Sequence, residues 1–322
     1  MNKIEFGDCR EIMKQWAKDG VKAQTCVTSP PYFGLRDYGH KGQIGLEPTP
    51  DEYIAELVEV FRCVRDVLAD DGTLWLNIGD SYASYRDGKV IADSTRVDCT
   101  GTEVPKGSAK NRMASTFAGT GIKHKELIGI PWMLALALRA DGWYLRQDII
   151  WHKPNPMPES VKDRCTKAHE YLFLLTKQPK YYFDNEAIKE DAVSEDKRPS
   201  ALKRSRAFGY NTKDKQIKGY ADNPGEVSRD DVAPETRNRR SVWTVNTKPY
   251  KGAHFATFPP ALIEPCILAG SRIGDIVLDP FIGSGTTAEV AVQHGRQYIG
   301  CELNPEYEKL QLERIDSLGR LF

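Results

Sequence analysis

Short apolar runs alternate with longer amphipathic stretches over most of the chain. The apolar runs predict buried strands, each followed or ended by a glycine, a proline or a carboxylate, over 3–6, 23–27, 73–78, 275–279 and 297–301. Apolar positions at a 3.6-residue period predict helices over 11–19, 50–68, 130–140 and 261–269. Strands that alternate with helices across glycine turns indicate an α/β protein with a parallel sheet.

Two segments break this rhythm, and a pair of strands lies between them. Residues 86–125 are polar and carry eight Lys/Arg against four Asp/Glu, so we expect a mobile insertion. The apolar runs 143–151 and 170–176 are close enough in sequence to pair as an antiparallel hairpin. Residues 197–240 show no pattern and hold 12 Lys/Arg and 6 Asp/Glu, interleaved with aromatic side chains. Their composition fits a nucleic-acid-facing segment and a solvated linker equally well.

Composition bounds the class of protein. With 322 residues, 40% of them apolar, the chain can bury a large core, and we expect one catalytic domain with insertions. It has no charged and apolar leader and no apolar run near the roughly 18 residues of a membrane helix, which predicts a soluble, cytoplasmic protein. The seven cysteines form no C-x-x-C pair, so we expect no metal site and no disulfide framework. The 45 basic and 45 acidic residues balance, so only the local excess indicates nucleic acid.

The strand at 23–27 leads into the sequence Thr28-Ser29-Pro30-Pro31-Tyr32. Two prolines after a buried strand predict a rigid, extended turn, and because proline has no N–H, the carbonyls there can point outward at a ligand. The turn then offers a hydroxyl, a carbonyl and an aromatic face side by side. This combination suits a flat ring with an exocyclic amine, although a simple tight turn at a strand end would show the same pattern.

A glycine-rich stretch, 279–287, follows the strand that ends at Asp279 and leads into a helix. Glycines let the backbone approach a cofactor, and Glu302, at the end of the next strand, can accept two ribose hydroxyls. The stretch has no Gly-Lys-Ser/Thr, which argues against a phosphate-binding loop of the nucleotidase type. Gly283, Gly285 and Ala288 still satisfy the dinucleotide fingerprint, so the loop alone does not exclude an oxidoreductase.

Considered together, 28–32 and 279–287 closely resemble the two main motifs of the DNA amino-methyltransferases that use S-adenosylmethionine. The order, catalytic motif first and cofactor motif last, is similar to the β group of that family, and the resemblance covers nearly the whole chain. It extends to Gly7-Asp8, Trp151-His152-Lys153-Pro154, His254-Phe255-Ala256-Thr257-Phe258-Pro259 and Tyr298-Ile299-Gly300-Cys301-Glu302. The resemblance implies a circularly permuted, Rossmann-like methyltransferase fold, with a mostly parallel seven-stranded sheet and an antiparallel hairpin.

The resemblance also implies roles for individual residues. The target-base pocket would consist of Ser29, Pro30, Pro31 and Tyr32. The cofactor S-adenosylmethionine would be bound by Asp8, Phe255, Thr257, Phe258, Asp279, Pro280, Phe281, Gly283, Ser284, Gly285, Thr286, Thr287 and Glu302. Of these, Asp8 would contact the adenine amine and Glu302 the ribose hydroxyls.

The basic segment falls where the family has its target-recognition region. We therefore expect a catalytic half over 1–190, a DNA-binding insertion over 191–245 and a cofactor-binding half over 246–322. The candidate DNA-binding residues are Lys203, Arg204, Arg206, Arg237, Arg239 and Arg240. Double-stranded DNA is the expected partner, and the resemblance is compatible with a homodimer and with a cognate restriction endonuclease.

A base amine is a poor nucleophile because its lone pair is delocalised into the ring. The Ser29 oxygen and the Pro30 carbonyl can accept its two hydrogens, which favours a pyramidal nitrogen and direct in-line methyl transfer. Tyr32 would stack on a base that has swung out of the duplex. Serine at position 29, where most adenine-N6 enzymes have aspartate, slightly favours cytosine N4, with adenine N6 nearly level. An RNA or protein methyltransferase and a catalytically silent DNA-binding module are the rival classes.

Three further residues have a structural as well as a functional interpretation. Cys266 superficially resembles the nucleophile of cytosine-C5 enzymes, but its apolar surroundings predict a core residue. Asp80 would either contact the active site or cap a helix. Trp151 would either approach the base or pack at its strand end.

Overall fold

The computed structural model describes residues 1–35, 39–40, 42–83, 121–192, 236–247 and 258–319. The chain divides into two units, of which the first comprises Met1–Asp184 with Ser241–Phe322 and the second Asn185–Arg240. The boundaries of the second unit are close to those of the predicted insertion. In the described part of the chain, no helix is long and apolar enough to cross a membrane.

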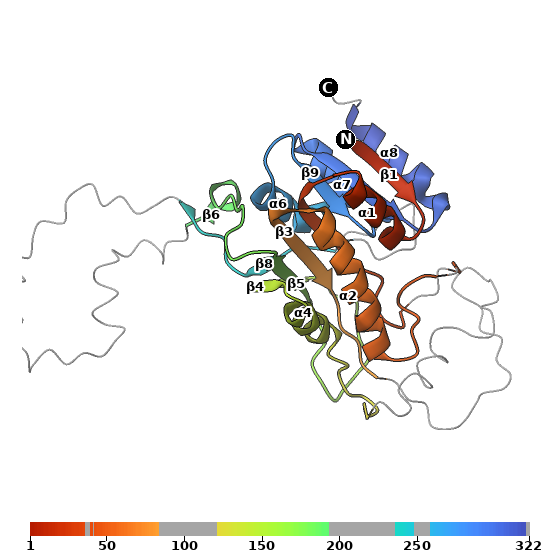
Figure 1. Ribbon diagram of the computed structural model, residues 1–322. Helices are drawn as coiled ribbons and strands as arrows, with labels where there is room; N and C mark the ends of the chain where they lie inside the picture. The colour runs from red at the N-terminus through yellow and green to blue at the C-terminus, as the bar shows by residue number, and fades with distance from the viewer. Residues whose placement is uncertain (36–38, 41, 84–120, 193–235, 248–257, 320–322) are drawn as a thin grey trace, which may run out of the picture. The chain divides into compact units, whose positions relative to one another are not determined.

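One sheet of eight described strands runs through the first unit (Figure 1). In spatial order the strands are β1 (Asn2–Phe6), β10 (Gln297–Glu302), β9 (Ile276–Asp279), β2 (Ala23–Thr28), β3 (Leu68–Ile78), β5 (His169–Thr176), β4 (Tyr144–His152) and β8 (Val242–Thr244). β5 is antiparallel to both of its neighbours, and the other neighbouring pairs are parallel. The mostly parallel sheet and the antiparallel hairpin are therefore confirmed.

The sheet has one strand more than the seven expected. The additional strand, β8, lies parallel to β4 and comes from the end of the region expected to be an insertion. Its three residues are too short a run for the hydrophobic pattern to detect.

The strand order confirms the permuted arrangement. β9 and β10, late in the sequence, lie between β1 and β2, which are early. Because β2 and β9 are parallel neighbours, the segments that follow their carboxyl ends emerge side by side. The two motifs found in the sequence are these segments.

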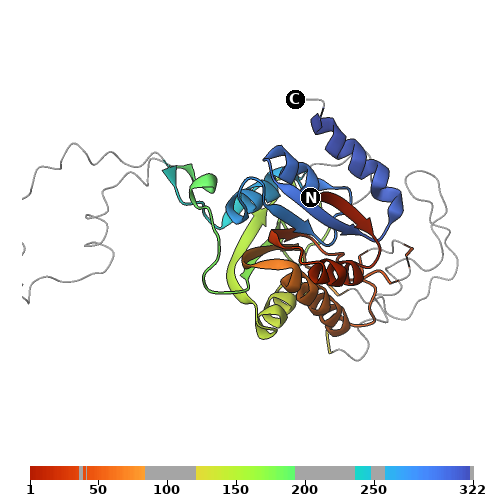
Figure 2. The same ribbon diagram turned by 45° about the horizontal axis from the view of Figure 1, so that its top comes forward.

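Helices cover both faces of the sheet (Figure 2). On one face lie α1 (Cys9–Lys18), α2 (Pro50–Val67) and α4 (Ile130–Ala140), and on the other lie α6 (Pro260–Gly270), α7 (Thr286–Gln293) and α8 (Glu308–Gly319). Successive side chains of a strand point to opposite faces, so Leu74 and Leu76 of β3 face α2, whereas Thr73 and Trp75 lie against Gly270 of α6.

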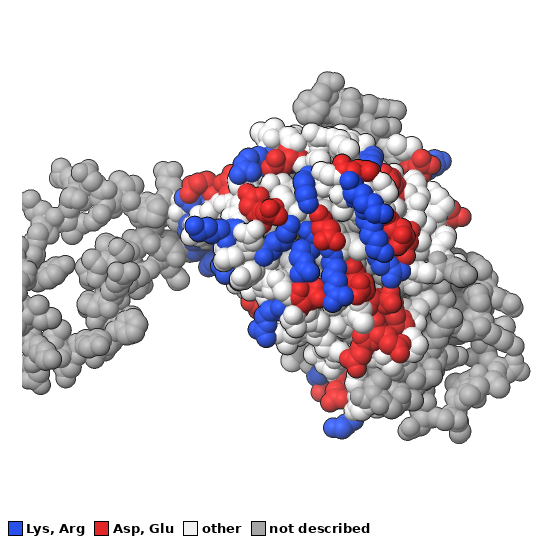
Figure 3. Space-filling model, viewed as in Figure 1, with Lys and Arg blue, Asp and Glu red and all other residues white. Residues whose placement is uncertain are grey.

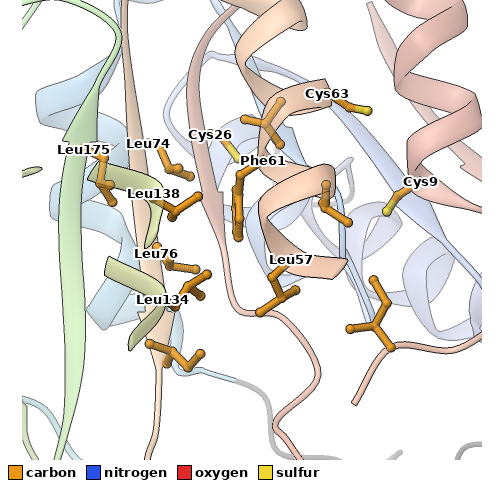
Figure 4. Packing of buried hydrophobic residues seen from close by; sticks show 14 of the residues in the cluster. Cys9, Cys26, Leu57, Phe61, Cys63, Leu74, Leu76, Leu134, Leu138 and Leu175 are labelled. Atoms are coloured by element: carbon orange, nitrogen blue, oxygen red, sulfur yellow. The ribbon is translucent and has the colours of Figure 1, made fainter. Parts of the chain in front are cut away.

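The core on the α2 side combines aliphatic and aromatic side chains (Figure 4). Leu57 and Phe61 of α2 point toward the sheet, and Leu134 and Leu138 of α4 lie beside them; all four are 0% exposed. Complete burial of such a side chain contributes about 1.5–3 kcal/mol each. This layer fixes α2, and with it the side chain of Tyr53 discussed below.

The largest difference from the predicted elements is at the start of β3. The helix ends at Val67 and the strand begins at Leu68, not at residue 73, because Leu68 already pairs with Ala23. A register shift between Ala23 and Thr25 accommodates the extra residues of β3. A Cβ at Gly72 would lie 2.9 Å from the Gln24 carbonyl oxygen, so glycine fits this bulge where larger residues would not.

The second unit contains a short 3₁₀ turn (Glu186–Ile188) and two strands, β6 (Glu190–Asp191) and β7 (Thr236–Arg237), paired antiparallel. Arg237 and Arg240 both donate through Nε to one Glu190 oxygen, at 3.0 and 2.9 Å. Lys203, Arg204 and Arg206 lie outside the described residues, as does most of the predicted insertion at 86–125.

Candidate active site

Segments from the ends of four parallel strands line one hollow of about 190 Å³. They are Gly7 and Asp8 after β1, 29–32 after β2, 280–284 after β9, and Glu302 at the end of β10. A hollow at the carboxyl ends of parallel strands is the usual ligand site of such sheets. The structure thus brings together the two motifs that lie far apart in sequence.

The glycine loop is held by the carboxylate of Glu302. One oxygen of Glu302 accepts from the Gly283 N–H at 2.9 Å, and the other accepts from the Asn304 N–H at 2.8 Å. Burial raises the pKa of Glu302 above its ordinary value. Gly285 has a φ of +87° at the start of α7, a conformation that favours glycine. Each Glu302 oxygen keeps a lone pair with which it can accept a ligand hydroxyl.

Helix α8, which the hydrophobic pattern did not predict, supports the same loop from the other side. Gln311 donates through Nε2 to the Gly283 carbonyl at 2.7 Å. Arg314 donates to the Ser284 hydroxyl oxygen at 3.2 Å and to the Thr286 hydroxyl oxygen. These contacts depend on where α8 packs, so no local sequence signal could have identified Gln311 or Arg314.

The Asp279 side chain lies below the hollow and does not line it. Its carboxylate is 1% exposed and accepts from the Thr28 and Thr287 hydroxyls, both at 2.6 Å, and from the Phe281 N–H at 3.0 Å. Burial raises its pKa to about 6. Asp279 and Thr287 therefore join β2 to the glycine loop, whereas Pro280, Phe281, Gly283, Ser284 and Thr286 face the hollow.

At the other motif, the carbonyls of Pro30 and Pro31 differ in their hydrogen bonding. The buried hydroxyl of Tyr53, on α2, donates to the Pro31 carbonyl at 2.7 Å. The Pro30 carbonyl accepts no hydrogen bond from the described residues. Half-buried Ser29 stands next to Pro30 at the wall of the hollow. The hollow is thus lined by a serine and by a proline whose carbonyl has no donor among the described residues, and their role as acceptors for a ligand stays a prediction.

Tyr32 is held at its hydroxyl and at its ring edge. The hydroxyl donates to Glu170 of β5 at 2.7 Å, and Glu170 also forms an ion pair with Lys153. A Cβ at Gly79 would lie 2.7 Å from the Tyr32 ring, so a glycine is needed for this approach. Burial and the charge of Glu170 raise the pKa of Tyr32. Sequence reasoning missed both Glu170 and Gly79 because strand pairing brings them here.

Asp8 lines the hollow and also begins α1. It accepts from the Arg10 N–H at 2.8 Å and pairs with the Arg10 guanidinium at 2.7 Å, which lowers the pKa of Asp8. Phe258 lines the hollow as well. Phe255 and Thr257 lie outside the described residues.

The three ambiguous residues have structural contacts. Asp80 accepts from the N–H groups of Gly129 and Ile130 at 3.1 and 3.2 Å, so it caps the start of α4. Trp151 is 4% exposed and donates to the Val245 carbonyl. Cys266 is 0% exposed, as predicted for a core residue. Among the described residues, no three His, Cys, Asp or Glu side chains are grouped to hold a metal.

Comparisons with known proteins place this site in a family. The family model N6_N4_Mtase, described as DNA methylase, matches residues 23–313. The chain is 46% identical over 309 residues to the Type II methyltransferase M.Cfr9I of Citrobacter freundii, covering 96% of this chain and 86% of the relative. It is 47% identical over 313 residues to the Type II methyltransferase M.SmaI of Serratia marcescens, covering 97% and 90%.

Solved structures share the fold. The PvuII DNA methyltransferase, which is cytosine-N4-specific, matches with a TM-score of 0.58 at 17% identity, covering 97% of this chain and 86% of that one. The complex of M1.HpyAVI with SAM matches with a TM-score of 0.54 at 18% identity, covering 98% and 100%. Because the family model matches residues 23–313 and two bacterial relatives are 46% and 47% identical, this chain belongs to the DNA methylase family of S-adenosylmethionine-dependent amino-methyltransferases.

Proposed function

We propose that the protein methylates the exocyclic amine of a flipped base within a specific site of duplex DNA, and that the base is cytosine, modified at N4. The observation that supports this most is the shared hollow, in which the acceptors of 29–32 face the loop that Glu302 holds. A methyl donor on the loop side would lie next to an amine held on the other side.

The residues present fit S-adenosylmethionine. The Glu302 carboxylate suits the two hydroxyls of a ribose, Asp8 offers acceptors for an adenine amine, and Phe258 and Phe281 supply apolar surface. Glycine at 283 lets the backbone lie close to a ligand. When bound, the cofactor supplies an electrophilic methyl group on a positively charged sulfur.

On the base side, the chain's own groups prepare the nucleophile. The Ser29 oxygen and the Pro30 carbonyl accept the two amine hydrogens, so the nitrogen lone pair points into the hollow. The Pro31 carbonyl does not compete for them, because Tyr53 already donates to it. Fixed acceptors of this kind act by orientation and by charge stabilisation, without a covalent enzyme intermediate. Tyr32 offers its ring face to the flipped base and offsets part of the unstacking cost.

The choice of cytosine rests on Ser29, since serine at this position is the commoner form in cytosine-N4 enzymes. Adenine N6 is the nearest alternative, because a hydroxyl accepts a hydrogen from either amine. The Type II names of the relatives support a cognate restriction endonuclease as a partner. A homodimer, a cytoplasmic location and target recognition by 191–245 complete the proposal.

Nucleoside mass spectrometry tests the proposal. The protein is incubated with unmethylated genomic DNA and S-adenosylmethionine, and the DNA is digested and analysed. N4-methylcytosine is the expected product, and N6-methyladenine would overturn the choice of base alone. If a folded protein that binds the cofactor yields neither, the substrate is RNA or protein, and the proposal fails.

A further inference from the structure

Glu170 is the centre of a hydrogen-bonded group behind the turn 29–32. One of its oxygens accepts from the Tyr32 hydroxyl at 2.7 Å and from Asn77 Nδ2 at 3.4 Å, and the other pairs with Lys153. The Lys153 and Glu170 side chains are only 17% and 16% exposed, so water competes little for these contacts. Three strands meet here, because Asn77 lies on β3, Glu170 on β5, and Lys153 directly after β4.

The contacts fix the direction of a hydroxyl hydrogen. A carboxylate only accepts, so the Tyr32 hydrogen points at Glu170. Burial and the Glu170 charge raise the pKa of Tyr32, which favours the protonated hydroxyl that donates to Glu170.

Tyr32 lines the hollow, where the proposed function places the flipped base. The hydrogen bond to Glu170 holds the hydroxyl end of its ring, and the close approach of Gly79 leaves room for the ring edge. Glu170 therefore fixes the orientation of the face on which the base would stack.

We propose that Glu170 is a positioning residue for methyl transfer, which acts through the Tyr32 hydroxyl to hold the ring on which the flipped base stacks. This rests on the proposed function. Glu170 is not among the residues that line the hollow, so it acts on the reaction without touching cofactor or base. The ion pair with Lys153 holds the Glu170 side chain in place.

A double-mutant cycle tests the proposal in the full-length protein. Glu170→Ala and Tyr32→Phe are each expected to lower kcat about 10- to 100-fold, since loss of orientation costs this much. Tyr32→Phe keeps the stacking ring and removes only the hydroxyl. The kcat of the double variant is expected to be at most about twofold lower than that of the less active single variant, because both substitutions break the same chain of contacts. Losses that multiply would overturn the proposal.

Further variants separate positioning from general damage. Glu170→Gln retains an acceptor oxygen for Tyr32, and its kcat is expected within about fivefold of the wild type; a loss equal to that of Glu170→Ala would refute the route through Tyr32. The cofactor Kd, measured by calorimetry, should change less than about twofold in all three single variants. Asp141→Asn is the matched control, because Asp141 is also a part-buried carboxylate, 12% exposed and paired with Arg62. It should lower Tm and leave kcat unchanged.

The outcomes distinguish this inference from the proposed function. If the wild type methylates DNA and Tyr32→Phe is as active as the wild type, the inference fails and the function stands. If Glu170→Ala does not fold, as judged by its Tm, Glu170→Gln and Tyr32→Phe still decide. If the wild type does not methylate DNA at all, the proposed function itself has failed.

Discussion

At the scale of single residues, the Asp279 carboxylate shows how one buried charge can serve structure within an active site. It accepts from Thr28 on β2 and Thr287 on α7, and so holds the turn 29–32 and the glycine loop at a fixed separation. Hydrogen bonds to a charged group contribute about 1.5–3 kcal/mol each. The loss of hydration when the carboxylate is buried opposes this stabilisation, and the raised pKa of Asp279 reflects that loss.

This cost predicts a pH dependence of stability. The pKa of Asp279 is about 6 in the folded protein against an ordinary 3.8, so the folded state binds the proton more tightly. Protonation of Asp279 therefore adds about 3 kcal/mol to the free energy of unfolding. This contribution is fully present below about pH 4 and is lost as the pH rises through 6. Asp279→Asn removes this titration. Between pH 5 and 7.5 the variant should gain about 1 kcal/mol relative to the wild type in urea unfolding. If the free energies of unfolding of the two proteins change in parallel with pH, the raised pKa of Asp279 is not the cause of the pH dependence.

Gly79 provides a second prediction at this scale. A Cβ at this position would meet the Tyr32 ring at 2.7 Å and the Glu170 side chain at 3.3 Å, so Gly79→Ala should displace the ring. We expect kcat for DNA methylation to fall about 100-fold, because a displacement of about 1 Å at a reacting group can reduce the rate by this factor. The cofactor Kd should stay constant. Gly20→Ala is the control, because its φ of +75° strains alanine but nothing lies within 4 Å. It should lower Tm and spare kcat.

Sequence reasoning predicted the residues of the site whose signal is local. The turn at 29–32 and the loop at 280–284 were predicted because prolines and glycines restrict or free the backbone where they stand. Glu170 and Tyr53 were not predicted as site residues. Each reaches the site through packing of a distant element, and nothing next to them in sequence indicates this.

At the scale of elements, α8 stabilises the cofactor side of the site. It packs against α7 and places Gln311, which is 2% exposed, against the Gly283 carbonyl. The same glycine donates its N–H to Glu302. Both backbone groups of Gly283 are thus held before any ligand binds, which lowers the cost of ordering the loop.

Removing the Gln311 amide should weaken cofactor binding. Gln311→Ala leaves the Gly283 carbonyl without its donor, a loss of about 1–3 kcal/mol, so the cofactor Kd should rise about tenfold by calorimetry. Leu312→Ala, on the same helix but 53% exposed, should leave the Kd unchanged. Equal effects of the two substitutions would mean that α8 acts only through its overall stability.

Elements were predicted well where hydrophobic periodicity is strong, and their described bounds lie within two residues of those expected apart from the start of β3. That start was missed because Leu68 belongs to two patterns, the last turn of a helix and the first pair of a bulged strand. β8 was missed because pairing with β4, and no pattern of its own, makes it a strand.

At the scale of the whole molecule, the balance of charge is even, and Figure 3 shows basic and acidic side chains interspersed on the face it presents. Attraction to DNA must therefore come from local groups. Arg240 and Arg237 share one acidic partner, but the side chain of Arg240 is 64% exposed and that of Arg237 only 15%. Arg240 is therefore the better candidate for contact with phosphate, and Arg237 for holding β7 to β6.

This difference can be measured by the salt dependence of DNA binding. Arg240→Ala should weaken binding to all sequences alike and reduce the slope of log K against log salt by about 1. Lys14→Ala, an exposed lysine of α1 paired with Glu11, should leave the slope unchanged. An unchanged slope for Arg240→Ala would remove Arg240 from the candidate DNA-binding residues.

The pairing of β1 with β10 has a consequence for how the protein is made. Asn2 lies opposite Tyr298, so β1 lacks its one neighbour in the described sheet until nearly 300 further residues have left the ribosome. One edge of β2 likewise stays unpaired until β9 has been synthesised. Exposed strand edges on a growing chain favour aggregation, so we expect nascent chains to depend on chaperones. Because the hollow is complete only when β9 and β10 have been added to the sheet, methyl transfer cannot begin before these strands are made, and a cell gains this activity only from chains that have been synthesised through β10.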